Sequence, residues 1–293
     1  MKVLCFGSLN LDKVYSVPHF VRPEETMSAY TLENFCGGKG LNQSIALARA
    51  GAHVWHAGAV GSSDGQVLLD NLTDSGVDTS LVQRLDGPTG HAIIQVNESG
   101  QNCILLFGGA NQQITRQQVD DTLVHFQVGD FLILQNEINQ LDYILRQAHE
   151  KGMCIFLNPS PMTPELLNLP LEYVDWFLLN EVEARDLCRA DVPENECPRM
   201  LLERFPDSHI VLTLGSRGSL YADSTQQLIQ PVYPGQVVDT TAAGDTFTGY
   251  LIAAIADGKT IPQALDEASR AAAIAVSRAG ASPSIPARNE ISF

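Results

Sequence analysis

The fold is decided by the stretch FLILQNEINQLDYILRQAHEKGMCIFLN, residues 131–158. It predicts a buried strand at 131–134, a helix near 139–151 and a second buried strand at 154–157. Further elements continue this alternation: strands at 2–7, 54–60, 176–179 and 210–214, and helices near 41–50, 65–75, 115–126, 181–189, 195–204, 244–257 and 261–278. Strands that alternate with helices form a mostly parallel sheet with helices on both faces, so the sequence predicts a three-layer α/β/α core.

Two β-rich patches interrupt this alternation. The first, residues 13–35, holds short β-like pieces at 14–17 and 26–30, and the second consists of hairpin strands at 91–96 and 102–107. We expect the two patches to form a small separate β-sheet, a lid over the edge of the large sheet where ligands bind. The predicted division is a core of residues 1–11, 36–88 and 111–293 and a lid of residues 12–35 and 89–110.

The charge of the chain limits its partners. Of the 293 residues, 18 are Lys or Arg and 34 are Asp or Glu, so the formal charge is −16. Nucleic acids and anionic membranes are bound by basic surfaces, and we therefore expect no nucleic-acid or membrane partner. A small anionic ligand is compatible with this charge because it needs only local hydrogen-bond donors.

The cysteines and apolar runs predict the compartment. None of the six cysteines forms a C-x-x-C pair or a zinc-finger spacing with histidines. We interpret them as thiols of a reducing compartment: Cys5, Cys36, Cys103, Cys154, Cys188 and Cys197. The N-terminal apolar run is too short for a signal peptide, and the longest later run, 250–256, is far below the ~20 residues of a membrane helix. The sequence therefore predicts a cytoplasmic protein.

The strongest candidate site is the segment VVDTTAAGDTF, residues 237–247. A short strand leads into a run of small residues, and a helix follows. The helix N-terminus would present four backbone amides to an anion: those of Ala242, Ala243, Gly244 and Asp245. Asp245 has two interpretations: a base that takes a proton from an attacking hydroxyl, or an acid that merely suits the start of a helix.

A second candidate is GGKGLNQ, residues 37–43, where three glycines precede a helix. Glycines allow a ligand to approach the backbone closely, and Lys39 and Asn42 would face it from the first helical turn. The alternative is a glycine-rich loop with a solvated lysine. A Walker A loop is excluded because Gly40, and not Ser or Thr, follows Lys39. The dinucleotide fingerprint is missing after the first strand, which argues against a nicotinamide oxidoreductase.

These two segments resemble the two signatures of the PfkB family of sugar kinases, and the likeness is closest to its ribokinase branch. Further motifs in the family's order extend the resemblance over nearly the whole chain: GSLNLD at 7–12, GGAN at 108–111, LNPSP at 157–161, NEVE at 180–183, TLGSRG at 213–218 and the tail 271–286. The resemblance implies a ribokinase-like fold, with a mostly parallel central sheet and a small β-sheet lid.

The resemblance also implies roles for individual residues. Asp245 would take the proton of the sugar's primary hydroxyl, and the amides of residues 242–245 would hold the charge of the transferring phosphoryl group. The sugar hydroxyls would be bound by Asn10, Asp12, Gly38, Lys39, Asn42 and Glu137. Carboxylates accept from hydroxyls, amides donate and accept, and the lysine donates. Taken singly, each of these is more often a surface polar residue.

ATP with Mg²⁺ is the phosphoryl donor that the resemblance implies. Asn180 and Glu183 would lie near the Mg²⁺ and the phosphates; the alternative is a helix cap and a surface acid. The nucleotide would contact Thr213, Gly215, Ser216, Gly218, Gly244 and Ser269. Ser269 stands where ribokinases often have a histidine beside the adenine.

A monovalent cation, with K⁺ favoured, is a further implication of the resemblance. It would be bound mostly through backbone carbonyls, by Asp239, Thr241, Val276, Gly280 and Ser284. Such a cation would lie next to the anion site and could order it.

The predicted lid favours a neutral sugar as substrate. Kinases of sugar phosphates need cations for the existing phosphate, but the lid offers only Lys13 and Arg22. With the matched residues, this predicts phosphorylation of D-ribose. Fructose, 2-keto-3-deoxygluconate, deoxyribose and adenosine stay open as substrates, and a sugar-binding regulator without catalysis is the alternative of another class.

Apolar side chains of the predicted lid need a surface to pack against. They are Val14, Val17, Ile93, Ile94, Ile104 and Leu105. We expect a homodimer that pairs lid against lid, an arrangement frequent in the family.

Overall fold

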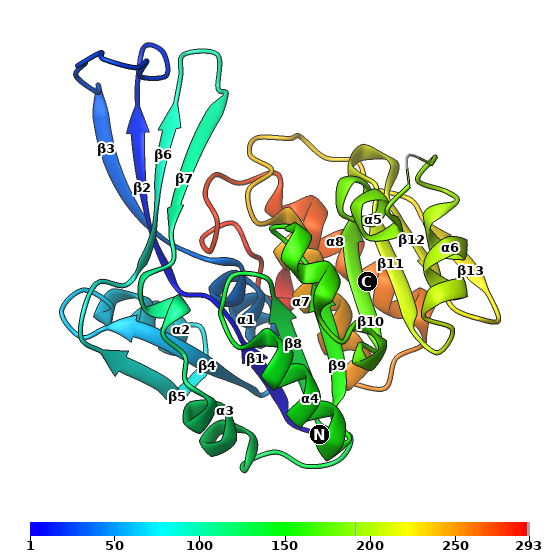
Figure 1. Cartoon of the computed structure of the whole chain (residues 1–293). Helices are drawn as coiled ribbons and strands as arrows, with labels where there is room; N and C mark the ends of the chain where they lie inside the picture. Colours follow the sequence, from blue (N-terminus) through cyan, green and yellow to red (C-terminus); the bar gives the residue numbers. More distant parts are fainter. Residues whose placement is uncertain (191, 292–293) are drawn as a thin grey trace.

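The computed structural model describes residues 1–190 and 192–291. Its largest sheet has nine strands in the order β13-β12-β11-β10-β9-β8-β1-β4-β5 (Figure 1). These strands are β1 (Val3–Phe6), β4 (Val54–Gly61), β5 (Asp78–Leu85), β8 (Phe131–Gln135), β9 (Cys154–Asn158), β10 (Trp176–Asn180), β11 (His209–Thr213), β12 (Ser219–Ala222) and β13 (Gln227–Gln230). Neighbours pair in parallel except at β12 and β13, which form an antiparallel edge. The predicted mostly parallel sheet is confirmed.

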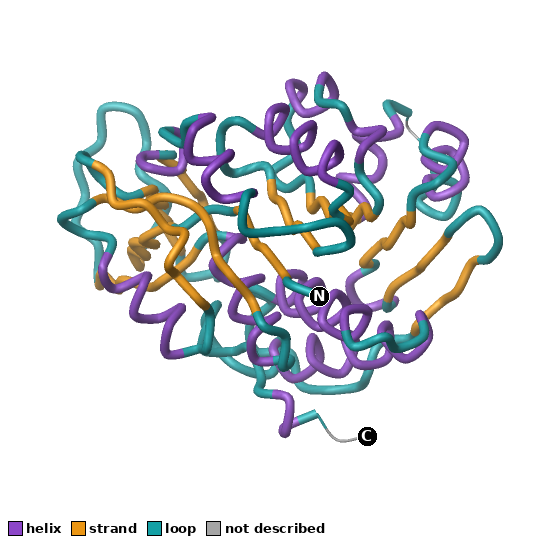
Figure 2. Tube along the Cα trace, turned by 90° about the horizontal axis from the view of Figure 1, so that it is seen from below, coloured by secondary structure: helices purple, strands orange, loops and turns teal. Residues whose placement is uncertain are grey.

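Helices cover both faces of this sheet (Figure 2). They are α1 (Lys39–Arg49), α2 (Gln66–Asp74), α3 (Arg116–Leu123), α4 (Leu141–Lys151), α5 (Glu181–Cys188), α6 (Cys197–Arg204), α7 (Ala243–Ala256) and α8 (Ile261–Ala275). Within residues 1–190 and 192–291, no helix has the length and apolar character needed to cross a bilayer.

The strand β1 shows how the two helical layers are separated. Successive side chains of a strand point to opposite faces of the sheet. Val3 and Cys5 pack in one hydrophobic cluster with residues of α1, α2, α7 and α8. Leu4 and Phe6 pack in the other cluster, with residues of α3, α4, α5 and α6. The chain therefore has the three-layer α/β/α architecture of the prediction.

A second sheet of four strands projects from one side of the core (Figure 1). In the order β3-β2-β6-β7, it consists of β2 (Asn10–Ser16), β3 (Thr31–Gly37), β6 (Gly90–Val96) and β7 (Asn102–Phe107). β2 pairs antiparallel with β3 and parallel with β6, and β6 and β7 form the expected hairpin. The two β-rich patches therefore form one small sheet, while the lid boundaries at 12–35 and 89–110 stay a prediction.

Some strands differ from the prediction. Residues 26–30 are not a strand, and β3 follows instead because pairing with β2 holds it from Thr31, opposite Ser16, to Gly37, opposite Asn10. The strands β5, β12 and β13 were not predicted. β5 and β13 are half-buried at most and lack an uninterrupted apolar run, so their pairing with β4 and β12 decides their conformation.

The parallel register brings the carboxyl ends of the central strands to one edge. Phe6 of β1 is level with Leu134 of β8, and Gln135 of β8 is level with Asn158 of β9. Ligands of open α/β sheets bind at this edge. The candidate site is therefore built where these strands end.

Candidate active site

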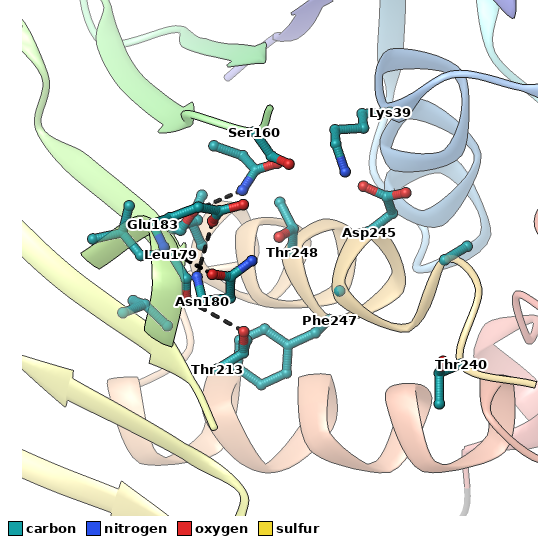
Figure 3. Close-up of a pocket in the computed structure, with 15 residues that line it drawn as sticks. Lys39, Ser160, Leu179, Asn180, Glu183, Thr213, Thr240, Asp245, Phe247 and Thr248 are labelled. Carbon is teal, nitrogen blue, oxygen red and sulfur yellow. Dashed lines mark hydrogen bonds between the residues drawn. The ribbon is translucent and has the colours of Figure 1, made fainter. Parts of the chain in front are cut away.

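A cavity of about 250 Å³ lies at this edge of the sheet (Figure 3). Six elements each contribute a polar residue to its wall: Lys39 of α1, Asn158 of β9, Asn180 of β10, Glu183 of α5, Thr213 of β11 and Asp245 of α7. Because these residues are borne by strands and helices, the wall is held by the packed core.

The first turn of α7 presents backbone amides to the cavity. Ala242 precedes the helix in the left-handed conformation, with φ 58°, and its carbonyl accepts the first ladder bond from the Thr246 amide at 2.8 Å. The amides of Gly244 and Asp245 come before this ladder. A Cβ at Gly244 would meet no atom within 4 Å, so an anion can approach both amides at the positive end of the helix dipole.

The Ala243 amide, one of the four predicted to face an anion, is already used in a hydrogen bond. It donates to the Thr240 carbonyl at 3.3 Å and so closes the turn that precedes the helix. The left-handed Ala242 makes this turn tight, a conformation that a sequence of small residues allows but does not reveal. The amides of Gly244 and Asp245, which follow this turn, stay candidates for the predicted anion site.

Asp245 is 9% exposed and is held at both carboxylate oxygens. Oδ2 accepts from Asn42 Nδ2 at 3.0 Å, and Oδ1 accepts from Gln43 Nε2 at 2.9 Å. Figure 3 shows this carboxylate and the ammonium group of Lys39 turned toward each other. A carboxylate that is oriented by two donors and lines a cavity can act as a positioned proton acceptor, which is one of the two interpretations left open by the sequence.

Lys39 stands among three carboxylates. Burial lowers its pKa, but the charges of Asp245, Glu137 and Glu183 outweigh this effect and raise it, so the lysine stays charged. Glu137 accepts at Oε2 from the Lys39 amide, at 3.1 Å, and from the Ser8 hydroxyl. Burial nevertheless raises the pKa of Glu137. A cation and a buried acceptor thus lie together at the start of α1.

Asn10 and Asp12 extend the polar surface onto the small sheet. Burial, and then the charge of Glu137, raises the pKa of Asp12 from its usual 3.8 to about 7. Asn10 is buried, and its Oδ1 accepts from Asn111 Nδ2 at 2.8 Å. This bond orients the Asn10 amide so that Nδ2 is the group left for a ligand.

Gly38 has a reason of its own to be glycine. Its φ is 96°, and a Cβ would lie 3.0 Å from the Ser8 carbonyl oxygen and 3.1 Å from the Asn10 nitrogen. Its carbonyl accepts from the Asn42 amide at 3.0 Å, which begins α1. Gly38 is therefore needed because its backbone lies close to the backbone of residues 8–10, and this need does not depend on any ligand.

Asn180 and Glu183 form a helix cap and also line the cavity. Asn180 Oδ1 accepts from the amides of Val182 and Glu183, each at 2.9 Å, and Glu183 Oε2 accepts from the Asn180 amide at 2.9 Å. This capping box starts α5, so the helix cap is real. Both residues also line the cavity, and Glu183 is buried and not a surface acid.

The predicted nucleotide residues do not all reach the cavity. Thr213 lines it, whereas Gly215, Ser216 and Gly218 follow outside its wall. Gly218 has φ 91°, and a Cβ there would overlap the carbonyl oxygen of Gln230 on the neighbouring strand, so this glycine serves the sheet edge. Ser269 is buried within α8 and is also absent from the cavity wall.

Four of the predicted cation residues, Asp239, Thr241, Val276 and Gly280, are linked by hydrogen bonds. Asp239 accepts from the Thr241 amide at 2.8 Å and from the Gly280 amide at 2.9 Å. Burial acts to raise the pKa of Asp239, but these hydrogen bonds outweigh it and lower the pKa. The Val276 carbonyl already accepts from the amides of Val238, at 2.8 Å, and Asp239, at 3.2 Å, which uses both its lone pairs and argues against its role as a ligand. Ser284 lies nearby in the chain and donates its hydroxyl to the Ala281 carbonyl at 2.7 Å.

A cluster of three or more His, Cys, Asp or Glu side chains suited to a metal does not occur in the described part of the chain. A cation bound near Asp239 would therefore depend on backbone oxygens. Such oxygen donors suit hard cations.

Comparison with known proteins identifies the family. A family model described as pfkB family carbohydrate kinase matches residues 1–288. The chain belongs to this family. It is 34% identical to the ribokinase of Haemophilus influenzae over 97% of this chain and 95% of that protein. The predicted resemblance is confirmed, and the protein is a carbohydrate kinase.

Solved structures of other PfkB kinases agree with the fold. The ribokinase of Cryptococcus neoformans in complex with ADP has a TM-score of 0.86 and 34% identity, covering 99% of this chain and 98% of that chain. Arabidopsis thaliana ribokinase complexed with ribose and ATP has a TM-score of 0.86 and 27% identity, covering 99% of this chain and 97% of that chain. The predicted ribokinase-like fold is therefore confirmed.

Among the polar residues of the site that were not predicted are Ser8, Gln43, Gln135, Asn111 and Asn158. Asn158 lines the cavity, and the others hydrogen-bond to predicted residues or to each other. Ser8, Gln135 and Asn158 each end or follow a buried strand of the parallel sheet. A polar residue at the carboxyl end of such a strand is a signal that could have found them.

Proposed function

We propose that this carbohydrate kinase transfers the γ-phosphoryl group of ATP to the primary hydroxyl of D-ribose and forms ribose 5-phosphate. The proposal is carried by the Asp245 carboxylate, which Asn42 and Gln43 hold at both oxygens beside the amides that begin α7. Phosphoryl transfer to a hydroxyl requires a proton acceptor and an anion site in close proximity.

In the proposed reaction, Asp245 accepts the proton of the primary hydroxyl while the hydroxyl oxygen attacks the γ-phosphorus and ADP leaves. The charge on the phosphoryl oxygens is stabilised by the amides of Gly244 and Asp245 and by the dipole of α7. Lys39 adds a positive charge from the same cavity wall. The protein's contribution is mainly positioning and electrostatics, as is typical of this reaction.

The sugar would be bound by the polar residues at the junction of the two sheets: Asn10, Asp12, Gly38, Lys39, Asn42 and Glu137. Asn42 supports this assignment, because its Nδ2 donates to Asp245 while its Oδ1 is buried without a partner among the described residues. A buried acceptor without a donor costs about 1–3 kcal/mol, and a sugar hydroxyl is a suitable donor.

Two observations favour ribose among the possible sugars. The relatives described above are named ribokinases, and the Arabidopsis structure is described as complexed with ribose and ATP. The two lid segments contain only Lys13 and Arg22 as cations, which is unfavourable for a second phosphate. The test is kcat/KM on ribose, fructose, 2-deoxyribose, 2-keto-3-deoxygluconate, adenosine and fructose 6-phosphate. Ribose should rank first, and a rank well below another sugar would contradict the proposal.

We propose that the ATP phosphates lie against Asn180, Glu183 and Thr213. Glu183 is a buried carboxylate in the cavity wall, and carboxylate and phosphate oxygens are the ligands that Mg²⁺ prefers. Bound Mg²⁺ would neutralise charge on the phosphates. Asp239 with the loop carbonyls, Val276 excepted, offers oxygen donors for a monovalent cation. Assays with and without K⁺ test this part, and equal activity in both would contradict it.

We further propose a homodimer through the small sheet. Its two edge strands expose large apolar side chains: Leu32, Phe35, Ile104, Leu105, Leu106 and Phe107. Val17 must be removed from the predicted surface because it is only 5% exposed, and Val14, Ile93 and Ile94 are half-buried. A patch of this kind needs a cover. Light scattering should report a dimer at micromolar concentration, and a monomer would contradict the proposal.

The proposed compartment is the cytoplasm. All six cysteines of the chain are free thiols, which suits a reducing environment. Localisation of the tagged full-length protein tests this.

A further inference from the structure

A row of buried side chains leads from Asp245 into the core. Gln43 Nε2 donates to Asp245 Oδ1 at 2.9 Å, and Gln43 Oε1 accepts from Gln135 Nε2 at 2.7 Å. Gln135 Nε2 also donates to Cys5 Sγ at 3.6 Å. Gln43, Gln135 and Cys5 are each 0% exposed, and Gln135 and Cys5 do not line the cavity.

The Cys5 end of this row sets the orientation of the Gln135 amide. Burial raises the pKa of Cys5 to about 11, so the thiol keeps its proton. That proton is directed to the Gly40 carbonyl at 3.5 Å, which leaves the sulfur as an acceptor. Gln135 must therefore present its nitrogen, and Gln43 must turn its carbonyl oxygen toward that nitrogen. The nitrogen of Gln43 is then directed to Asp245.

We propose that Gln135 is a positioning residue that acts through Gln43 to keep a hydrogen-bond donor on Oδ1 of Asp245. The inference rests on the proposed function, in which Asp245 is the base. The Gln43 nitrogen also donates to Asn158 Oδ1 at 3.5 Å, and Gln135 supplies the donor for the Gln43 oxygen, so this orientation of the Gln43 amide satisfies both of its ends. The Gln43 carbonyl in place of that nitrogen would repel Oδ1 and turn the carboxylate out of the orientation that Asn42 and Gln43 maintain.

The oxygen of the Gln135 amide supports this assignment. Gln135 Oε1 is buried without a hydrogen-bond partner among the described residues. A Cβ at Gly7 would overlap this oxygen, so the glycine directly after β1 leaves room for it. An unsatisfied buried oxygen costs about 1–3 kcal/mol, a penalty that an apolar side chain would avoid. The orientation of the Gln135 amide is therefore set by the hydrogen bonds that its nitrogen donates to Gln43 and Cys5.

The test is a comparison of kcat and KM for ribose in matched variants. Gln135→Glu puts an acceptor opposite the Gln43 carbonyl, and so opposes the orientation in which the Gln43 nitrogen donates to Asp245. We expect kcat to fall by roughly tenfold or more, as for other residues that orient a reacting group. The KM for ribose should stay within about twofold of wild type, because Gln135 touches none of the proposed sugar ligands.

Gln118→Leu is the matched control. Gln118 is 2% exposed, donates from Nε2 to the Gly58 carbonyl at 2.7 Å and has an Oε1 without a partner among the described residues. It lies in α3, on the other face of the sheet. The control should lose thermal stability without losing kcat. A fall in kcat that Gln118→Leu shares with the Gln135 variants would overturn the inference.

Coupling provides an independent readout. If Gln135 acts only through Gln43, then Gln135→Met should lower kcat in the wild type and have no further effect after Gln43→Met. Gln135→Met also replaces Gln135→Glu if the latter does not fold, since it keeps length without a charge. Additive losses, or wild-type kcat in either folded Gln135 variant, would overturn the inference.

Asp245→Asn, measured in parallel, separates the two levels of the proposal. An unchanged kcat in Asp245→Asn would contradict the role of Asp245 as the base, and with it the proposed function. A large loss of kcat in Asp245→Asn, together with an unchanged kcat in the Gln135 variants, would contradict only the positioning role of Gln135.

Discussion

The two sides of the candidate site are built in opposite ways. On the side of α1 and α7, the residues from 40 to 47 and from 245 to 254 are all buried, and Asn42 and Gln43 bond to Asp245 between the two helices. On the side of the small sheet, every residue of β7 is exposed, and so are the first five residues of β3. One side is part of the core, and the other is a surface.

This difference suggests a division of labour. A packed interior is stiff, so it can hold a proton acceptor in one orientation. A sheet with few buried contacts is free to adjust to a sugar or to a second subunit. Substitutions on the core side should therefore change kcat and stability, and substitutions on the lid side should change KM and association.

The largest effect is expected at Asp245. Asp245→Asn keeps the shape of the side chain but removes the proposed proton acceptor, and kcat should fall roughly 10²–10⁴-fold, the usual contribution of general-base catalysis. Ribose binding, measured by calorimetry, should be retained. A catalytically silent sugar-binding regulator predicts no change, because it has no turnover to lose.

Stability should differ just as clearly between the two sides. Phe6 of β1 is fully buried in the core, and Phe6→Ala should lower the free energy of unfolding by about 3–5 kcal/mol. Phe107 on β7 is 50% exposed, and Phe107→Ala should change monomer stability by no more than about 0.5 kcal/mol. Urea denaturation of both variants measures the difference. Similar losses would mean that the small sheet is as tightly packed as the core.

Association should depend on the lid alone. Leu105 is 67% exposed on β7, and Leu105→Glu should raise the Kd of the proposed dimer by at least about 30-fold, the effect of losing an interface hot spot. Val124, 69% exposed at the end of α3, provides the control, since Val124→Glu should leave the dimer intact. Sedimentation across a concentration series distinguishes these outcomes.

Sugar binding should depend on pH through Asp12 on the lid side. Its pKa of about 7 means that the carboxyl gains a proton as pH falls below 7 and then accepts fewer hydrogen bonds from a hydroxyl. The KM for ribose should therefore rise about tenfold between pH 8 and pH 6, following the ionised fraction. Asp12→Asn should flatten this dependence, and a profile unchanged by the substitution would exclude Asp12 as its cause.

The same pKa shift of Asp12 predicts that stability depends on pH. Because the folded pKa of Asp12 lies above its usual 3.8, the folded state binds more protons than the unfolded state between pH 4 and 7. The contribution of Asp12 to stability is therefore present below pH 4 and is lost as pH rises through 7. Thermal melts of Asp12→Asn and wild type across this range measure the difference.

Local patterns in the sequence were sufficient to predict the architecture and the family. Apolar runs alternating with helices predict the α/β/α core, because burial on both faces of a parallel sheet leaves a local pattern. The segments 37–43 and 237–247 identify the site for the same reason, since a helix start and its small residues are neighbours in the chain.

The long-range hydrogen bonds of the site and the edge strands could be known only from the tertiary structure. Asn42 is 203 residues from Asp245, and Gln43 is 92 residues from Gln135, so the bonds that orient the carboxylate exist only after the sheet has formed. The same is true of the edge strands β5 and β13, which depend on a neighbour for their hydrogen bonds. A hydrogen bond needs a donor and an acceptor, and a single chain segment contains only one of the two when the partners are far apart in the sequence.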